Sequence, residues 1–163
     1  MPRRNIEVQD LTAICDSREQ TPLDLAPMRT ERAGLTTGDY SIRGLEDVIA
    51  IERKSLTDLV GCVGVERERF ERELVRLRAY PCRAVVVEAT WGELLAGGWR
   101  SKVTPASASG SVLAWISDGI PFLFVGNHEE AGRAVARLMF VAARREWRKL
   151  QALNGTLALI DRE

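Results

Sequence analysis

Two carboxylates and a lysine lie within a short stretch of the chain. Glu52 and Lys54 end an apolar run, and Asp39 precedes that run, directly after Gly38. In an extended strand, residues two apart point to the same face, so Glu52 and Lys54 project together while Arg53 projects to the other side. We expect Asp39, on the preceding strand of a hairpin, to reach the same place.

A further acid can come from the end of another strand. Asp16 and Glu19 follow the apolar run 12–15, so either could join Asp39 and Glu52. Carboxylates gathered in one place repel one another unless a cation lies between them, and oxygen ligands suit Mg²⁺ or Mn²⁺. Such an ion lowers the pKa of bound water, and Lys54 adds a point charge near a phosphate, so the set predicts phosphodiester hydrolysis. The competing interpretation of Glu-Arg-Lys is a solvated strand end without chemistry.

These residues depend on strands and helices that alternate along the chain. We predict strands at 12–15, 35–42, 48–53, 84–88 and 121–125, and a small one at 156–160 after a turn at 154–155. Helices are predicted from Ser55, over 66–80, between Val112 and Gly119, and from Asn127 to about Leu150. Segments 21–30 and 101–110 are predicted to be loops, and 43–47 the turn of an antiparallel hairpin. This alternation predicts an α/β class with a mixed sheet.

The composition sets broader limits. A chain of 163 residues predicts one domain, 1–163, and 45% hydrophobic residues suffice for a core. The 23 Lys and Arg balance 23 Asp and Glu, which does not favour a nucleic-acid binder but leaves one open, because an acidic metal site can mask a basic face. Three cysteines without metal-type spacing favour a reduced, intracellular protein. No apolar run suggests a secretion signal or a membrane span.

The acids and the lysine fall into one spaced pattern. Gly38-Asp39 is followed, after a gap, by Glu52-Arg53-Lys54-x3-Asp58, and Asp16-x-Arg18-Glu19 ends the first predicted strand. This pattern resembles the nuclease domain of the XPF family of structure-specific endonucleases, whose motif is Gly-Asp, a variable gap, then Glu-Arg-Lys-x3-Asp. The resemblance covers roughly Ala13 to Leu150, which predicts a nuclease core over about 12–150.

The resemblance implies a restriction-endonuclease-like core, in which helices flank a mixed central β-sheet. It implies a Mg²⁺- or Mn²⁺-dependent endonuclease that cuts branched, flap or fork DNA. The implied metal ligands are Asp16, Asp39, Glu52 and the backbone carbonyl of Arg53, and the implied catalytic residues are the three acids and Lys54. The implied supporting residues are Arg18, Glu19, Arg53 and Asp58. Asp58 alternatively caps the helix that follows Ser55, and Arg53 forms an ion pair or contacts a phosphate.

Basic side chains elsewhere are candidate DNA contacts. We select Arg67, Arg69, Arg100 and Lys102. The last predicted helix is also basic from Gly132 on, which suits phosphate binding or simply a solvated helix face. The only histidine, His128, is expected in the first turn of that helix and not at the site.

Family nuclease domains commonly dimerise, so we expect a homodimer. Phe140 and Trp147, seven residues apart on the last helix, extend either the core or the dimer face. The chain departs from the family in one respect, since we find no Gly-x-Gly pairs of a helix-hairpin-helix domain, the part that usually grips DNA. The alternatives are therefore a Holliday-junction resolvase, a restriction-like nuclease, or a non-catalytic DNA-binding or dimerisation module.

The architecture also suggests where such a protein works. We expect a stand-alone, cytoplasmic, nucleoid-associated enzyme of bacterial or phage origin. Its expected partner is DNA, and we expect no membrane association. DNA repair, DNA recombination, phage replication and defence against mobile elements all remain open as pathways.

Overall fold

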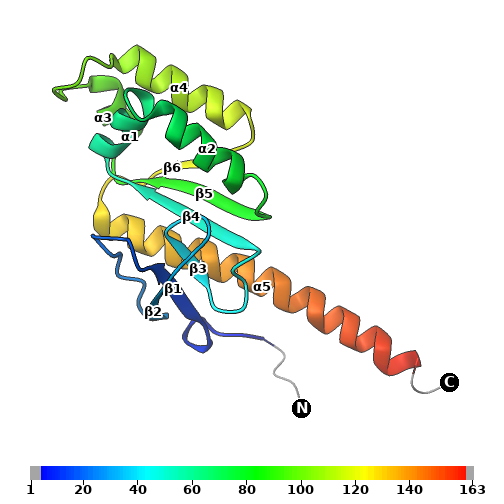
Figure 1. The fold of residues 1–163 in the computed structure, drawn as a ribbon. Coiled ribbons are helices and arrows are strands. Elements are labelled where there is room, and N and C mark those ends of the chain that lie inside the picture. The colour runs from blue at the N-terminus through cyan, green and yellow to red at the C-terminus, as the bar shows by residue number, and fades with distance from the viewer. Residues whose placement is uncertain (1–4, 161–163) are drawn as a thin grey trace.

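The fold is built on one six-stranded sheet (Figure 1). The computed structural model describes residues 5–160, and their side chains as far as residue 157. The strands are β1 (Thr12–Asp16), β2 (Arg29–Ala33), β3 (Tyr40–Ile42), β4 (Ile49–Lys54), β5 (Cys82–Val87) and β6 (Phe122–Phe124). The helices are the 3-10 turn η1 (Val8–Asp10) and the α-helices α1 (Leu56–Val63), α2 (Arg67–Leu77), α3 (Trp91–Ala96), α4 (Pro105–Ser117) and α5 (His128–Ile160).

The topology of the sheet brings the ends of several strands together. The strand order is β2-β1-β3-β4-β5-β6. β3 pairs antiparallel with both β1 and β4, and the other pairs are parallel, which confirms the predicted mixed sheet and its hairpin. The strands β1, β4 and β5 therefore run in one direction and end at the same end of the sheet, where β3 begins. Residues that follow these strands, or precede β3, meet there.

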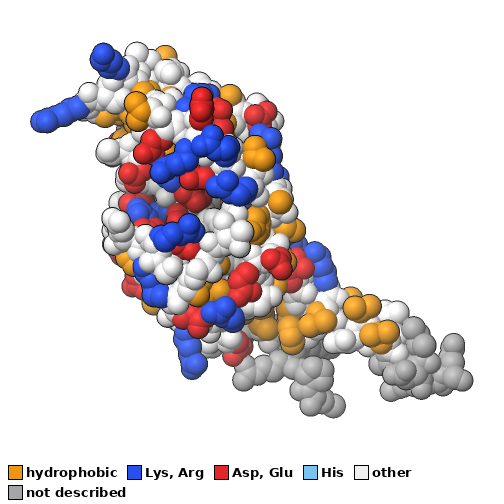
Figure 2. Space-filling model, viewed as in Figure 1, with side chains coloured by type: hydrophobic (Ala, Val, Ile, Leu, Met, Phe, Trp, Pro, Cys, Tyr) orange, Lys and Arg blue, Asp and Glu red, His pale blue; other side chains and the backbone are white. Residues whose placement is uncertain are grey.

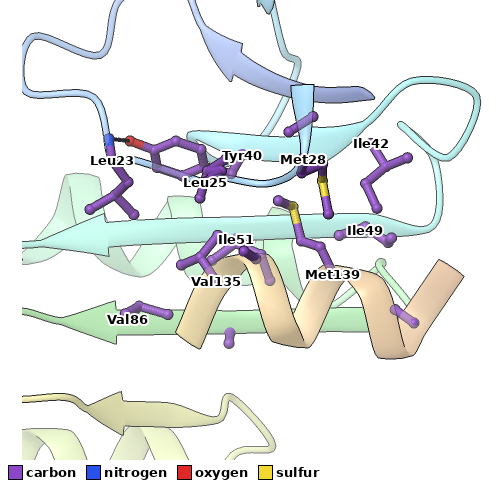
Figure 3. Packing of buried hydrophobic residues seen from close by; sticks show 14 of the residues in the cluster. Leu23, Leu25, Met28, Tyr40, Ile42, Ile49, Ile51, Val86, Val135 and Met139 are labelled. Carbon is purple, nitrogen blue, oxygen red and sulfur yellow. Dashed lines mark hydrogen bonds between the residues drawn. The ribbon is translucent and has the colours of Figure 1, made fainter. Parts of the chain in front are cut away.

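Helices cover both faces of the sheet (Figure 1). Helices α1 to α4 pack on one face, and α5 covers the other, where its Val135 and Met139 lie beside Ile49 and Ile51 of β4 (Figure 3). Ala50, between these two isoleucines, belongs to the opposite cluster. This alternation continues along β4, so Arg53 projects toward α5 while its two neighbours project toward α1 and α2.

Capping side chains fix where most helices begin. The side chain of Ser55 accepts a hydrogen bond from the Asp58 amide at 3.1 Å, and that of Asn127 accepts one from the Glu130 amide at 2.9 Å. Helices were predicted to start at Ser55 and at Asn127, and both starts are confirmed. Thr104 caps α4 in the same way, accepting from the Ser107 amide.

Several predicted boundaries are wrong. The strand predicted over 35–42 contains only β3, because Gly38 adopts a positive φ of 78° that interrupts an extended strand. The segments 21–30 and 101–110 were predicted to be loops, but they contain the start of β2 and the first turns of α4. The strand predicted at 121–125 is shorter, Phe122–Phe124, and it is the edge strand β6, whose Leu123 is 38% exposed.

The last helix is longer than predicted. α5 continues to Ile160, so neither the turn at 154–155 nor the strand at 156–160 forms. The C-terminal half of this helix extends away from the sheet (Figure 1). Between residues 5 and 160, no helix combines the length and the apolar character needed to cross a membrane.

Candidate active site

The glycine of the Gly-Asp pair permits a close main-chain approach. Gly38 has a φ of 78°, and a Cβ atom there would lie 3.0 Å from the Ile51 carbonyl oxygen. The next residue uses this proximity, because the Asp39 amide donates to the Ile51 oxygen at 2.8 Å and the Asp39 oxygen accepts from the Asp16 amide at 2.7 Å. The main chain at Asp39 therefore joins β1 to β4, and its carboxylate starts from a fixed position.

A cavity of about 710 Å³ lies at this end of the sheet. Every residue predicted as catalytic or supporting lines it: Asp16, Arg18, Glu19, Asp39, Glu52, Arg53, Lys54 and Asp58. Figure 2 shows acidic and basic side chains mixed around a hollow in the face that carries α1 and α2. The structure thus brings together residues from three strand ends and the start of α1.

Glu52 and Lys54 project together, as strand geometry requires. Lys54 Nζ donates to Glu52 Oε1 at 2.6 Å, and it lies 5.3 Å from the centre of the Phe70 ring on α2. Burial lowers the pKa of Lys54, but the charge of Glu52 and this hydrogen bond outweigh burial, so the pKa is raised overall. Burial raises the pKa of Glu52 despite the nearby ammonium. The lysine is therefore positively charged at neutral pH.

The surroundings of Asp39 disfavour its charged form. Burial, followed by the negative charge of Glu52, raises its pKa to about 7. One hydrogen bond acts in the opposite direction, because the Arg53 amide donates to Asp39 Oδ2 at 2.8 Å. Two carboxylates held this close in a poorly hydrated place favour a cation between them.

Asp16 is the acid whose oxygens are already occupied. Its Oδ1 accepts from the Arg18 side chain at 2.7 Å and from the Arg18 amide at 2.9 Å, and its Oδ2 accepts from the Leu35 amide at 2.7 Å. Burial raises the pKa of Asp16, but these hydrogen bonds outweigh it and lower the pKa overall. Asp16 lines the cavity as a carboxylate that ties β1 to the segment before β3.

Arg53 and Glu19 form a buried ion pair behind the reactive face. Arg53 Nε and Nη2 donate to the two carboxylate oxygens of Glu19 at 2.8 and 2.9 Å, and Nη1 donates to Glu88 at 3.0 Å. The side chains of Arg53 and Glu19 are only 10% and 5% exposed. Of the two roles considered for Arg53, the geometry favours the ion pair over a phosphate contact.

Asp58 caps α1 and also faces the cavity. Its Oδ2 accepts from the Ser55 amide at 3.4 Å, which completes the capping box, and also from the Ser55 hydroxyl at 2.7 Å. The prediction that Asp58 caps this helix is therefore confirmed.

The donor set suits a divalent cation in part. Asp39 and Glu52 offer carboxylate oxygens in one cavity, and their mutual repulsion is what a hard cation relieves. Among residues 5–160, no three acidic, histidine or cysteine side chains lie close enough as placed to hold one ion. Asp16, the third predicted ligand, lines the same cavity, with its oxygens held by Arg18 and by the Leu35 amide.

A family model decides the relationship. The ERCC4 domain model matches residues 5–138, most of the chain. The chain belongs to the ERCC4 domain family. This confirms the resemblance to the XPF nuclease domain that the motifs indicated. A comparison with curated proteins finds no significant match.

Solved structures agree with this ERCC4 domain in fold. XPF from Aeropyrum pernix is 19% identical with a TM-score of 0.66, and the alignment covers 82% of this chain and 62% of that one. The same protein in complex with DNA gives 19% identity and a TM-score of 0.65, covering 83% of this chain and 66% of that one. The chain therefore spans just under two thirds of each neighbour. The predicted restriction-endonuclease-like fold is confirmed.

Three residues of the ERCC4 domain that line or support the site were not selected from the sequence. Glu73 on α2 lines the cavity, and its Oε2 is buried without a hydrogen-bond partner. Glu88 follows β5 and could have been found, because polar residues at the carboxyl ends of buried strands gather at one end of the sheet. His128 reaches Glu88 across forty positions of sequence, which no local pattern reveals.

The candidate DNA contacts of the ERCC4 domain fall into two groups. Arg69 lines the cavity, and Arg67 donates to Ser111 at 2.9 Å and lies 5.4 Å from the Trp115 ring, which ties it into the fold. Arg100 and Lys102 are exposed on the segment between α3 and α4, outside the cavity lining.

Proposed function

We propose that the chain is a divalent-metal-dependent endonuclease that hydrolyses phosphodiester bonds in DNA. The observation that carries this proposal is the placement of Asp39 and Glu52 in one cavity, beside a charged lysine. Asp39 has a pKa of about 7 because of burial and the charge of Glu52. Membership of the ERCC4 domain family supports the same activity.

Asp39, Glu52 and the backbone carbonyl of Arg53 would hold Mg²⁺ or Mn²⁺. When bound, the ion would supply an activated water and stabilise negative charge on the scissile phosphate. The Arg53 amide orients the Asp39 carboxylate by donating to its Oδ2 at 2.8 Å.

Lys54 contributes charge and not proton abstraction. Its raised pKa keeps it an ammonium at neutral pH, so it cannot serve as a general base there. A fixed positive charge in a partly buried cavity stabilises the extra negative charge that develops on a phosphate during hydrolysis. Arg18, whose side chain is 75% exposed at the cavity, is placed to contact a neighbouring phosphate.

Branched, flap or fork DNA is the substrate class that we favour. The solved XPF neighbour in complex with DNA supports a DNA substrate for this fold. A Holliday junction or a restriction-like duplex site is the second candidate within the same chemistry.

We also propose a homodimer. The part of α5 that extends from the sheet exposes Leu150, Leu153 and Leu157, each about half exposed and spaced along one face of the helix. A second copy is the simplest partner that would cover this stripe. Sedimentation velocity should show a dimer, and Leu153→Glu should shift it to the monomer.

Cleavage assays test the activity directly. Labelled flap, fork, four-way junction and linear duplex DNA should be incubated with the protein in Mg²⁺, in Mn²⁺ and in EDTA. We expect metal-dependent cutting, strongest on a branched substrate, and its loss in Asp39→Ala and in Glu52→Ala. Glu46→Ala is the matched control, since this acid lies in the hairpin turn and does not line the cavity. Failure of the wild-type protein to cut any substrate would leave the non-catalytic module as the function.

A further inference from the structure

A row of hydrogen-bonded charges lies behind the proposed nuclease site. His128 Nδ1 lies 2.6 Å from Glu88 Oε1, and the same oxygen accepts from Arg53 Nη1 at 3.0 Å. Arg53 in turn donates two hydrogen bonds to Glu19. These four residues come from α5, the end of β5, β4 and the segment after β1. The row therefore crosses the sheet and fastens it to α5.

The row is anchored at both ends. At one end, His128 Nε2 lies 3.3 Å from the Pro22 carbonyl oxygen. At the other, Glu19 accepts from the Thr21 amide at 3.0 Å and lies 3.4 Å from the Tyr40 hydroxyl. Each inner side chain thus has partners on two sides, so its orientation is determined by contacts and not by solvent.

The inner members are well shielded from water. The side chain of Glu88 is 12% exposed and that of Arg53 is 10% exposed. Removing one partner from a buried charge pair leaves the other charge uncompensated, so the remaining groups must move or rehydrate. The row is therefore sensitive to the loss of any inner member.

Arg53 transmits this constraint to the reactive face. Its amide donates to Asp39 at 2.8 Å, and its two chain neighbours are Glu52 and Lys54. Its side chain projects to the opposite side of β4, where Glu88 and Glu19 hold it. Fixing the guanidinium from behind therefore fixes the strand end that carries Glu52 and Lys54, and with it the amide that holds Asp39.

We propose that Glu88 and His128 are positioning residues of this site, acting through Arg53 on Asp39, Glu52 and Lys54. The proposal rests on the nuclease function proposed above. Neither residue lines the cavity, so both act without touching DNA or metal.

A set of variants separates positioning from mere stability. Glu88→Ala and His128→Ala remove the contacts, alone and together. Glu88→Gln and His128→Asn retain a hydrogen-bonding group of similar reach. Glu129→Gln is the control, because Glu129 neighbours His128 on α5 and forms an ion pair with Arg133 at the surface.

The first measurement is kinetic, at saturating Mg²⁺ on whichever DNA the wild-type protein cuts. We expect Glu88→Ala to lower kcat by about 10- to 100-fold, as loss of partners that orient metal ligands does elsewhere. KM for DNA should stay within about twofold, since no DNA contact is removed. His128→Ala should lose less, His128→Asn and Glu88→Gln should recover part of the rate, and the double variant should be no worse than Glu88→Ala.

The second measurement needs neither DNA nor metal. The NMR chemical shift of the Arg53 amide should move in Glu88→Ala and in His128→Ala, and should stay at the wild-type value in Glu129→Gln. A wild-type protein that cuts no DNA would overturn the nuclease function, while the Arg53 amide would still decide the positioning role. Folded Glu88→Ala with wild-type kcat, or with an unmoved Arg53 amide, overturns the positioning role and leaves the nuclease function standing.

Discussion

At the scale of single residues, Asp39 links stability to pH. Its pKa is raised from 3.8 to about 7 by burial and by Glu52, so between these values the folded protein binds more protons than the unfolded chain. Stability must therefore fall as pH rises from about 4 to 7, by the linkage between proton binding and unfolding. Without metal, the ionised Asp39 is a liability of the fold.

The variant Asp39→Asn tests this liability. In EDTA at pH 8 we expect this variant to be more stable than the wild-type protein, with a free energy of unfolding larger by on the order of 2–4 kcal/mol. The reason is that a neutral amide replaces a charge that is repelled by Glu52. The difference should vanish at about pH 3, where Asp39 is protonated in both the folded and the unfolded chain. Urea titrations at both pH values measure it, and equal stabilities at pH 8 would contradict the assignment. Added Mg²⁺ should stabilise only the wild-type protein.

Lys54 separates metal binding from turnover. In Lys54→Met we expect calorimetry to detect Mg²⁺ binding at least as tight as in the wild-type protein, because the hydrogen bond that Lys54 donates to Glu52 competes with a metal for that oxygen. We expect kcat to fall on the order of 10²- to 10³-fold, as for other fixed charges that stabilise a transition state. Lys149→Met, at an exposed position of α5, is the control. Lost metal affinity would instead mean that Lys54 organises the ligands.

At the scale of elements, α5 is positioned by a contact that excludes any side chain. A Cβ atom added at Gly132 would overlap the carbonyl oxygen of Asp24, so the first turns of the helix lie directly on this loop. The same approach allows His128 to reach Pro22. Glycine at this position thus serves close packing and not flexibility.

Two alanine substitutions in helices should therefore have opposite signs. We expect Gly132→Ala to destabilise the protein by about 1–3 kcal/mol, as overpacking does, despite the better helix propensity of alanine. Gly110→Ala in α4 is the matched control, because nothing lies within 4 Å of its added Cβ, and it should stabilise by about 0.5–1 kcal/mol. Urea unfolding of both variants decides the point. A stabilised Gly132→Ala would show that the loop yields to the helix.

Some of the helices and strands could be predicted from the sequence, and others could not. Strand β4 and its acids were predictable, because an apolar run followed by Glu52 and Lys54 specifies both a buried strand and its polar end. The start of α4 was missed although Thr104 and Pro105 are a cap and a first-turn proline, since the surrounding Ser and Ala favoured a loop. The contact of His128 with Glu88 depends on which helix covers which face of the sheet, and that is decided by packing over the whole chain.

For the molecule as a whole, DNA binding depends on where the cationic side chains lie, because positive and negative charges balance. The formal net charge is zero, so DNA must be attracted by local groups of cations and not by the overall field. Among residues 5–160, Arg67 and Arg69 form ion pairs with acids, whereas Arg100 and Lys102 are exposed and form none. The segment between α3 and α4 is therefore the better candidate for a phosphate contact away from the cavity.

The double variant Arg100→Ala/Lys102→Ala tests this segment. Each lost phosphate contact removes about 0.9 from the slope of log affinity against log salt on duplex DNA, so we expect the slope to fall by about 2. The melting temperature should not change, because neither side chain packs against the fold. Arg67→Ala should behave in the opposite way, lowering the melting temperature through its lost contacts with Ser111 and Trp115. Fluorescence anisotropy over a salt series separates a DNA contact from a structural role, with Lys149→Ala on the distant part of α5 as the control. An unchanged slope in the double variant would place the DNA on another surface.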